Sequence, residues 1–517
     1  MNKKNDLKVA AVIDIGSSTL KMRISQLKKN KISDIDRLEH PVCLGHEVFT
    51  EGKISFESLR ELSSLLHGFS GVMDEYGVKQ YRVVATTALR DAKNRSYVVD
   101  QLRIQNGMNV EVLEDDQEKT LIYYEIIEFF KKAGKLNGES ALIAYIGAGT
   151  IGFAVYDGTQ MVFSQNIPMG SLKLPDMLGN IQNLSDDFYT VAEEYLDTIL
   201  EHIKIPINGG RVENLILTGT ETKLMAKICG IKPSGGCCVI NALKLRELFE
   251  KIRSMTREKI SLAYGISEED AELLYSSLAI SLRLLKFTTS DTVVSPDVEL
   301  WDALMRLMLM PKSGGDYSAH VRSNAISCAQ EIAKAYDCDA VHSETIRMFA
   351  CRIFDKMKGA HGLDRRKRLL LELAAILHEC GHYVTVKQHL ASSFDLIKDI
   401  DIYGMTDKEM LMTAYTARYN EYEVPAFDDF KSYVPDEGDR ITTAKLVAIF
   451  RLANALDKSR KQKLKDIKVR LKNDKLIISS QSGENFYLEM WAFRQCAPFF
   501  KEVFGYEPEL SVKSSLI

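Results

Sequence analysis

The residues with the clearest chemical potential lie in two glycine-containing turns, each of which follows an apolar segment. After Val9–Ile13 the chain continues with Asp14, Gly16, Ser17, Ser18 and Thr19. After Ala141–Ile146 it continues with Gly147, Ala148, Gly149 and Thr150. Backbone N–H groups and hydroxyls in such turns converge on anions, and a neighbouring carboxylate can hold Mg²⁺ beside phosphate oxygens. We expect both turns to hold phosphate and Asp14 to support a metal ion, although an ordinary glycine–serine hairpin has the same composition.

Two charged residues extend this prediction. Arg90 follows Thr86 and Thr87 in a segment that begins a helix, where a guanidinium can grip phosphate and free N–H groups attract anions. Glu118 lies close to the start of the next predicted helix, and a carboxylate aimed at a phosphate cleft can orient or deprotonate an attacking water. The alternatives are a capped helix with a solvated arginine and acids that only complement a helix dipole.

The predicted elements place these residues in a repeated α/β pattern. Strands are expected at 9–13, 20–26, 31–37, 81–85 and 110–113, with helices over 56–76 and 121–130. The segment 215–220 resembles a third turn of the same kind and contains Gly219. These repeats indicate a duplicated α/β half-domain with a phosphate cleft between the halves.

Composition narrows the class of protein. The 517 residues are 45% hydrophobic and 27% charged, with a net charge of −4, which disfavours a nucleic-acid-wrapping protein. We find no apolar run long enough to cross a membrane, and the N-terminus reads as a strand rather than a signal peptide. The nine scattered cysteines, without a Cys-x-x-Cys pair, favour reduced thiols and a cytoplasmic location.

Five segments in order resemble the exopolyphosphatase / guanosine pentaphosphatase (Ppx/GppA) family: VAAVIDIGSSTLKM, RVVATTALRDAKN, EVLEDDQEKTLIY, YIGAGTIGF and IPMGSLKL. The resemblance implies a ribonuclease H-like fold of the sugar kinase, Hsp70 and actin type. It also implies Mg²⁺-assisted hydrolysis of terminal phosphoanhydride bonds in polyphosphate or guanosine pentaphosphate. In this reading Glu118 and Asp14 are catalytic, and Arg90, Gly219 and the two turns bind phosphate.

The second turn departs from the family pattern Asp-Ile-Gly-Gly-Gly-Ser-Thr-Glu. Tyr145 replaces the aspartate, and Gly152 replaces the glutamate. Losing two carboxylates should weaken metal binding or misplace the water. A degenerate relative that senses polyphosphate or (p)ppGpp without hydrolysis is therefore an alternative to the hydrolase. Tyr145 could also stack on a nucleobase or serve the structure alone.

The chain beyond residue 324 is strongly helical and resembles the HD-type domain of long family members. His342, His378, Glu379 and Asp457 stand where such a domain holds divalent metals, with Glu379 in place of an aspartate. The His-Glu form favours a scaffold without metal, and a retained metal site is the alternative. Basic residues of the late helices either form a solvated face or bind a long polyanion; they are Arg418, Arg451, Lys458, Arg460, Lys461, Lys463 and Lys465.

The prediction as a whole is an α/β protein with a duplicated ribonuclease H-like domain, an all-α HD-like domain and a small α+β C-terminal region. The expected boundaries are 1–125 and 126–315 for the two halves, 316–465 for the helical domain and 466–517 for the last region. The expected partners are polyphosphate or guanosine penta- or tetraphosphate, with no membrane and no specific nucleic acid. The family resemblance implies a homodimer.

Overall fold

The computed structural model divides into two compact units, residues 1–321 and 322–517. It describes residues 8–514 apart from 137, 172, 174–187, 204, 207–210, 254, 311, 421–423, 425, 428–430, 432–433, 435 and 483. Two positions of the IPMGSLKL motif, 172 and 174, therefore lie outside the described residues. So do residues 1–7 of the N-terminal segment. No helix in the described part of the chain combines the length and apolarity needed to cross a membrane. All nine cysteines are free thiols.

The first half of unit 1 is a five-stranded sheet in the order β3-β2-β1-β4-β5. β1, β2 and β3 pair antiparallel, while β4 runs parallel to β1 and β5 parallel to β4, which is the ribonuclease H-like arrangement predicted from the sequence. The strands are β1 (Lys8–Ile15), β2 (Thr19–Lys28), β3 (Lys31–Pro41), β4 (Gln80–Ala85) and β5 (Val110–Val112). The helices are α1 (Leu44–Glu51), α2 (Phe56–Glu75), α3 (Thr87–Asp91), α4 (Arg95–Asn106) and α5 (Asp115–Lys132).

The local sequence explains where these elements begin and end. β1 is buried on both faces, as its run of β-branched and small apolar residues predicts. The side chain of Ser55 accepts a hydrogen bond from the N–H of Ser58 and so caps α2. α5 begins six residues earlier than the predicted start at Leu121, because Glu114 and Gln117 form a capping box. The acidic residues Asp115 and Glu118 are therefore in its first turn.

The second half of unit 1 repeats this arrangement with one added strand. Its six-stranded sheet has the order β10-β11-β9-β6-β7-β8, with β6–β8 antiparallel and β9 and β11 parallel to β6. The strands are β6 (Ala141–Ile146), β7 (Ile151–Tyr156), β8 (Met161–Ile167), β9 (Asn214–Thr218), β10 (Cys237–Asn241) and β11 (Thr292–Pro296). The helices are α7 (Phe188–Leu200), α8 (Thr220–Ile228), α9 (Ala242–Arg253), α10 (Arg257–Tyr264) and α11 (Glu268–Leu284). Each half has its own hydrophobic core.

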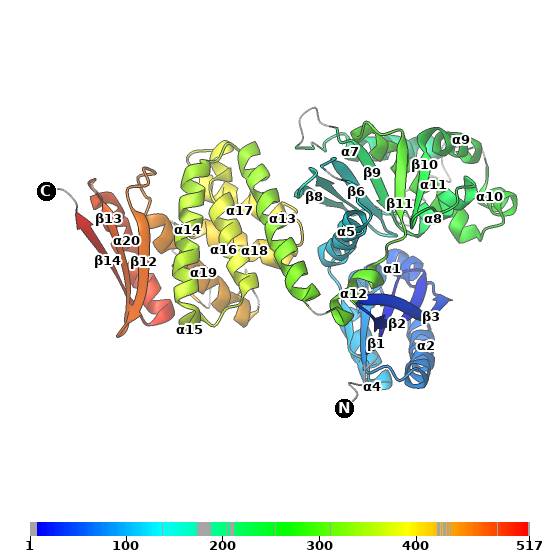
Figure 1. Ribbon diagram of the computed structural model, residues 1–517, viewed down its shortest axis with the longest axis horizontal. Coiled ribbons are helices and arrows are strands. Elements are labelled where there is room, and N and C mark those ends of the chain that lie inside the picture. Colours follow the sequence, from blue (N-terminus) through cyan, green and yellow to red (C-terminus); the bar gives the residue numbers. More distant parts are fainter. Residues whose placement is uncertain are drawn as a thin grey trace. The chain divides into compact units, whose positions relative to one another are not determined.

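Helix α12 (Leu300–Leu309) leaves the second sheet and returns to the first half, where it packs against β1 and α5 (Figure 1). Its buried Trp301 lies under the cationic groups of Lys21, Arg23 and Arg37. The Arg23 guanidinium also pairs with Asp302 at 2.5 Å. These contacts join the end of the second half to the first, so the chain crosses between the halves twice. The predicted boundaries 125/126 and 315/316 stay predictions.

Unit 2 contains helices followed by a small sheet. The helices are the C-terminal part of α13 (Ser313–Ala335), α14 (Ala340–Lys356), α15 (Lys358–His361), α16 (Arg365–Leu377), α17 (His389–Asp399), α18 (Asp407–Arg418) and α19 (Glu437–Ala455). The sheet has the order β12-β13-β14, formed by β12 (Lys465–Lys472), β13 (Lys475–Ser482) and β14 (Glu507–Ser514), with α20 (Tyr487–Phe504) connecting the parallel pair. The helical character and the small α+β end are as predicted from the sequence. The finer HD-like assignment and the 465/466 boundary stay predictions.

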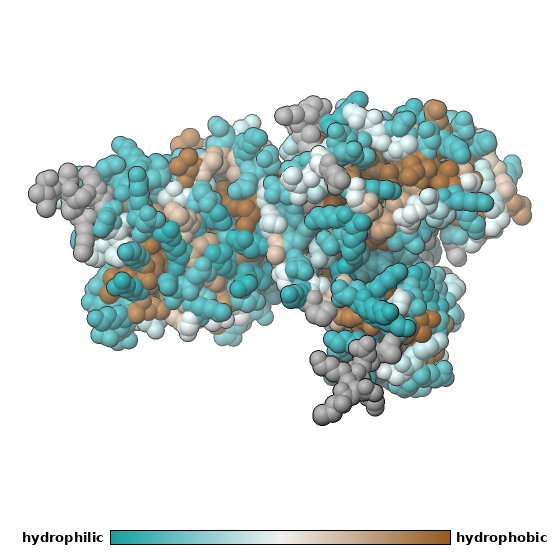
Figure 2. Space-filling model, in the orientation of Figure 1, coloured by the Kyte–Doolittle hydropathy of each residue, from teal (hydrophilic) through white to brown (hydrophobic). Residues whose placement is uncertain are grey.

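The face of unit 1 that Figure 2 displays carries both hydrophilic and hydrophobic residues. Hydrophobic residues gather on its second half, in the region that carries β9 and β11 in Figure 1, while the first half is mostly hydrophilic on this face.

Candidate functional site

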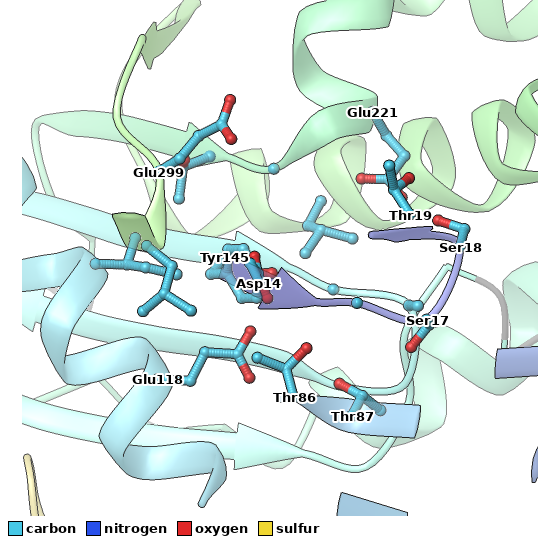
Figure 3. A pocket seen from close by; sticks show the side chains of 18 of the residues that line it. Asp14, Ser17, Ser18, Thr19, Thr86, Thr87, Glu118, Tyr145, Glu221 and Glu299 are labelled. Atoms are coloured by element: carbon cyan, nitrogen blue, oxygen red, sulfur yellow. The ribbon is translucent and has the colours of Figure 1, made fainter. Parts of the chain in front are cut away.

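The main site of unit 1 is a cavity of about 130 Å³ between its two halves. It lies where β1, β4, β6 and β9 end, which is where the duplicated topology brings the strand-ending turns together. We call it the phosphate pocket. Its polar lining includes Asp14, Ser17, Ser18, Thr19, Lys21, Thr86, Thr87, Glu118, Tyr145, Thr218, Glu221, Lys223 and Glu299 (Figure 3). The predicted Gly16, Gly147, Ala148 and Gly219 also line it.

The first turn is held by its own backbone. The Gly16 N–H donates to the Thr19 carbonyl at 3.0 Å, and the carbonyls of Ser17 and Ser18 accept from Gly45 and Val42. A Cβ at Gly16 would stand 2.9 Å from the Thr19 oxygen, so the narrow turn requires glycine. The hydroxyls of Ser17, Ser18 and Thr19 all line the pocket.

The second turn reaches the pocket with only its first two residues. The Gly147 N–H donates to the Thr150 carbonyl at 2.9 Å, while Gly147 and Ala148 accept hydrogen bonds from Ser171 and Lys173. Gly149 and Thr150, both predicted phosphate ligands, are not among the lining residues. The structure corrects their position, because they face residues of the first half instead.

The Thr150 side chain belongs to a hydrogen-bonded cluster around Asp115. The Asp115 Oδ1 accepts from the Thr150 hydroxyl at 2.9 Å and from Arg90 Nη2 at 3.1 Å, and its Oδ2 pairs with Lys119. Gly149 packs close by, since a Cβ there would stand only 2.4 Å from Cγ2 of Thr87. Through these contacts the Gly147–Thr150 turn of the second half packs against α3 and α5 of the first half.

Arg90 stands behind the pocket rather than in it. Its Nη1 donates to the Leu113 carbonyl at 2.9 Å and to Glu118 Oε2 at 3.1 Å, and its Nη2 also donates to Thr87. A guanidinium engaged with two carboxylates positions them, so the structure corrects the predicted place of Arg90 at a phosphate.

Glu118 and Asp14 both face the pocket (Figure 3). Burial raises the pKa of Glu118, although the Arg90 charge favours its ionised form. Burial, the Glu118 charge and the Glu299 charge raise the pKa of Asp14 to about 7, and the Lys21 charge opposes them. The Asp14 Oδ1 is buried without a hydrogen-bond partner. A buried carboxylate with a free oxygen is suited to a cation or a proton.

The two family departures take part in the site in different ways. Tyr145 lines the pocket, and its hydroxyl lies close enough to the Glu118 and Asp14 carboxylates to feel their charges. Burial, and then the charges of the nearby carboxylates, raise the Tyr145 pKa well above its ordinary value, so the phenol stays protonated. At Gly152 the space of a side chain is already filled: a Cβ there would stand 2.1 Å from Cδ of the buried Lys119 and 2.8 Å from the Tyr123 hydroxyl. The Lys119 side chain therefore occupies the place of the missing glutamate.

Four charged residues that line the pocket were not predicted from the sequence as site residues: Lys21, Glu221, Lys223 and Glu299. Glu221 is the second residue of α8, two residues after Gly219, and accepts from the Ser171 hydroxyl at 3.1 Å. Burial opposes ionisation of Glu299, yet the charges of Lys21 and Lys223 hold its pKa below the ordinary value. The Glu299–Asp302 capping box marks the helix start in the sequence, but only the fold brings that start to the pocket.

A second cluster lies in unit 2. Candidate ligand atoms of His342, His378 and Glu379 all lie within 4.8 Å of one another. Asp457, the fourth predicted metal ligand, is not in this group: its carboxylate accepts from His342 Nδ1 at 2.8 Å and from Gln462. The structure therefore places Asp457 behind His342, as a residue that orients the ring.

Neighbouring groups determine the protonation of His378 and the ion pairing of Glu379. Burial and the neighbouring His342 lower the pKa of His378 to about 3, so its ring is neutral, and its Nδ1–H donates to the Ala375 carbonyl at 3.0 Å. Glu379 pairs with the Arg460 guanidinium. His382 stacks on His389 at 3.9 Å between ring centroids, and both rings line the same small hollow.

Several of the late basic residues have structural contacts. Lys463 pairs with the buried Glu489 at 3.3 Å. The guanidiniums of Arg418 and Arg451 lie over the rings of Phe394 and Phe499. Together with the Arg460–Glu379 pair, these contacts give those residues protein partners, which differs from the predicted solvated face and does not favour a continuous polyanion track.

Comparison with protein-family models gives two matches. Residues 23–298 match the Ppx/GppA phosphatase family, and residues 321–492 match Ppx/GppA phosphatase domain III. The first match begins within β2 and ends just before α12, so it includes most of both halves of unit 1 but not β1 or the Gly16–Thr19 turn.

Solved structures similar to this chain have the same fold at low identity. An exopolyphosphatase from Cytophaga hutchinsonii is 19% identical with a TM-score of 0.52, and the match covers 58% of this chain and 97% of that one. The Aquifex aeolicus member of the Ppx/GppA family is 20% identical with a TM-score of 0.50, again over 58% and 97%. At this identity the likeness concerns the fold alone.

Proposed function

This chain belongs to the Ppx/GppA phosphatase family, and on that premise we propose that it is a phosphohydrolase. It would release terminal phosphate from inorganic polyphosphate or from guanosine 5′-triphosphate 3′-diphosphate. The observation that carries the proposal is the phosphate pocket, where Asp14 and Glu118 face the hydroxyls and amides of three strand-ending turns. Phosphoryl transfer depends on such positioning and charge stabilisation more than on covalent chemistry.

The residues have distinct parts in this proposal. The Gly16–Thr19 turn, Gly147, Ala148 and Gly219 hold phosphate oxygens through N–H and hydroxyl groups. Glu118 orients the attacking water and accepts its proton, and Arg90 fixes the direction of its carboxylate. Arg90 is thus a positioning residue.

The pocket offers one suitable ligand for a magnesium ion, the carboxylate of Asp14. The partnerless, buried oxygen of Asp14 is the hard oxygen ligand that Mg²⁺ prefers. Asp14 would hold the ion together with phosphate oxygens of the substrate, and the bound ion would offset their charge. Tyr145, a protonated phenol, adds no anionic ligand on the opposite wall.

Phosphate release with Mg²⁺ tests the proposal directly. Wild-type protein should release phosphate from polyphosphate or from the guanosine nucleotide, and Glu118→Gln should reduce the rate by about 10²–10⁴-fold, the usual contribution of a general base. Glu61→Gln, an exposed change on α2, is the matched control and should keep the wild-type rate. Absence of release from both substrates would refute the hydrolase proposal.

A second candidate is a module that binds these anions without hydrolysing them. It is favoured by Tyr145, a protonated phenol where the family pattern has an aspartate, and by Lys119, which fills the space of the missing acid. Calorimetry that shows tight binding without turnover would select it. Binding without turnover that becomes turnover in Tyr145→Asp would identify the phenol as the block.

The expected homodimer and cytoplasmic location stay predictions.

A further inference from the structure

A second hollow lies beside the phosphate pocket in the second half of unit 1. It measures about 580 Å³, against about 130 Å³ for the phosphate pocket. Small-molecule sites usually measure roughly 300–1,000 Å³, so the larger hollow has room for a ligand that the phosphate pocket cannot hold. We call it the α8–β10 pocket; it is lined by the end of α8, the turn before β10, and the end of β11.

The two pockets share one side chain. Lys223 lines both, and its ammonium pairs with Asp297 at 2.7 Å, in the α8–β10 pocket, and with Glu299, in the phosphate pocket. Glu221, near the start of α8, lines the phosphate pocket, while Gly230, just past the end of the helix, lines the other. α8 has nine residues, about 14 Å at 1.5 Å per residue, so the pockets lie toward opposite ends of one short helix.

The linings differ in chemistry. Charged and hydroxyl side chains dominate the phosphate pocket. The α8–β10 pocket has apolar walls from Ala226, Ile231, Pro233 and Pro296, and its lining also includes the exposed Lys227 and Lys232. An inorganic phosphate chain is charged and gains no binding energy from contact with an apolar wall. A nucleoside, with its flat base, would cover the wall and remove its apolar surface from water.

We propose that the α8–β10 pocket binds the nucleoside part of a nucleoside polyphosphate whose 5′ phosphates occupy the phosphate pocket, with Lys223 between the two parts. The proposal rests on the proposed function only for the placement of the phosphates. It makes a nucleotide, rather than inorganic polyphosphate, the better ligand of this chain. Lys227 and Lys232 are placed to meet further phosphates on the ribose.

Calorimetry with GTP and with inorganic tripolyphosphate tests this assignment. Ile231→Trp fills the pocket and should weaken GTP binding by about tenfold or more, the equivalent of roughly 1.4 kcal/mol, while tripolyphosphate binding stays within about twofold. Cys238→Trp, from a different wall, should do the same. Val239→Trp is the matched control, because the neighbouring Val239 is exposed and does not line the pocket.

Two results would overturn the proposal: GTP and tripolyphosphate binding wild-type protein equally well, or both filling variants leaving GTP binding unchanged in protein that melts at the wild-type temperature. Failure of the proposed function looks different. In that case no phosphate is released and Ser18→Ala leaves tripolyphosphate binding unchanged, while Ile231→Trp still weakens binding of guanosine alone.

Discussion

At the residue scale, Asp14 makes stability depend on pH. Its pKa of about 7 is raised from 3.8, so folding favours the protonated form. The resulting stabilisation is complete below pH 3.8 and is lost as pH rises through 7. The difference between a pKa of 3.8 and a pKa of about 7 corresponds to roughly 4 kcal/mol of unfolding free energy. We therefore expect Asp14→Asn, which cannot ionise, to gain up to about 4 kcal/mol over wild type between pH 4 and pH 8, measured as the difference in free energy of unfolding by denaturant titration.

The same two proteins can be compared with and without Mg²⁺. At pH 8 the ion should raise the unfolding free energy of wild type but not of Asp14→Asn, because only the ionised carboxylate binds it. A stability difference between the two proteins that is the same at pH 4 and pH 8 would contradict the raised pKa.

Gly152 and Lys119 form a second pair at this scale. Gly152→Ala should lower the free energy of unfolding by about 1–3 kcal/mol, because the new Cβ meets the buried lysine stem. In a Lys119→Ala background the same change should cost much less, and the double-mutant cycle measures the coupling. Additive effects would show that the lysine does not fill this space. Restoring a family-like acid with Gly152→Glu therefore requires the Lys119 change as well.

The sequence shows why this pair could be predicted only in part. Tyr145 and Gly152 stand out against the family pattern, because each changes the residue type within a short motif. Lys119 lies 33 positions before Gly152 in a helix, where a lysine is unremarkable. The same holds for Arg90: its residue type predicts an anion partner, and only the fold shows that the partners are Glu118 and Asp115.

At the element scale, the contact of the second turn with α3 sets how closely the halves of unit 1 approach. Gly149→Ala should place a methyl group 2.4 Å from Cγ2 of Thr87 and 3.2 Å from Phe49, and so push the turn away from the helix. We expect a loss of about 1–3 kcal/mol in unfolding free energy and weaker tripolyphosphate binding.

Thr87→Ser provides the rescue for this change. It removes the Cγ2 methyl but keeps the hydroxyl that accepts a hydrogen bond from Arg90. The double variant should recover most of the stability and binding, measured by thermal melting and calorimetry. If Thr87→Ser gives no recovery, Gly149 is required for a reason other than its contact with Thr87.

The elements themselves could be predicted well where local patterns decide them. The strands β1–β3 and helix α2 lie close to the ranges that periodicity predicts, because alternation and the capping Ser55 act locally. The last strand, β14, and the return of α12 to the first half did not follow from the sequence. Their places depend on pairing with β13 and on packing against β1, contacts between residues far apart in the chain.

At the scale of the whole molecule, the division at residue 321 predicts that ligands of each unit act on that unit alone. Tripolyphosphate should raise the unfolding temperature of unit 1, and a soft divalent ion such as Zn²⁺ that of unit 2. Scanning calorimetry resolves these effects if the transitions separate. Proteolysis with detection of fragments near residue 321 does so if they overlap.

The zinc effect should be small in wild type and larger in Arg460→Ala. His342 and His378 direct their Nδ1–H groups to Asp457 and Ala375, which leaves Nε2 of each ring for a metal, while Glu379 is paired with Arg460. Removing the half-exposed guanidinium frees the third ligand, so we expect zinc affinity to rise by about tenfold, a gain of about 1.4 kcal/mol, in a dialysis assay. His378→Ala in the same background should abolish the gain, and Arg365→Ala, on the surface of α16, should leave affinity unchanged. Equal zinc affinity of wild type and Arg460→Ala would show that this cluster is a scaffold whose buried rings pack rather than bind.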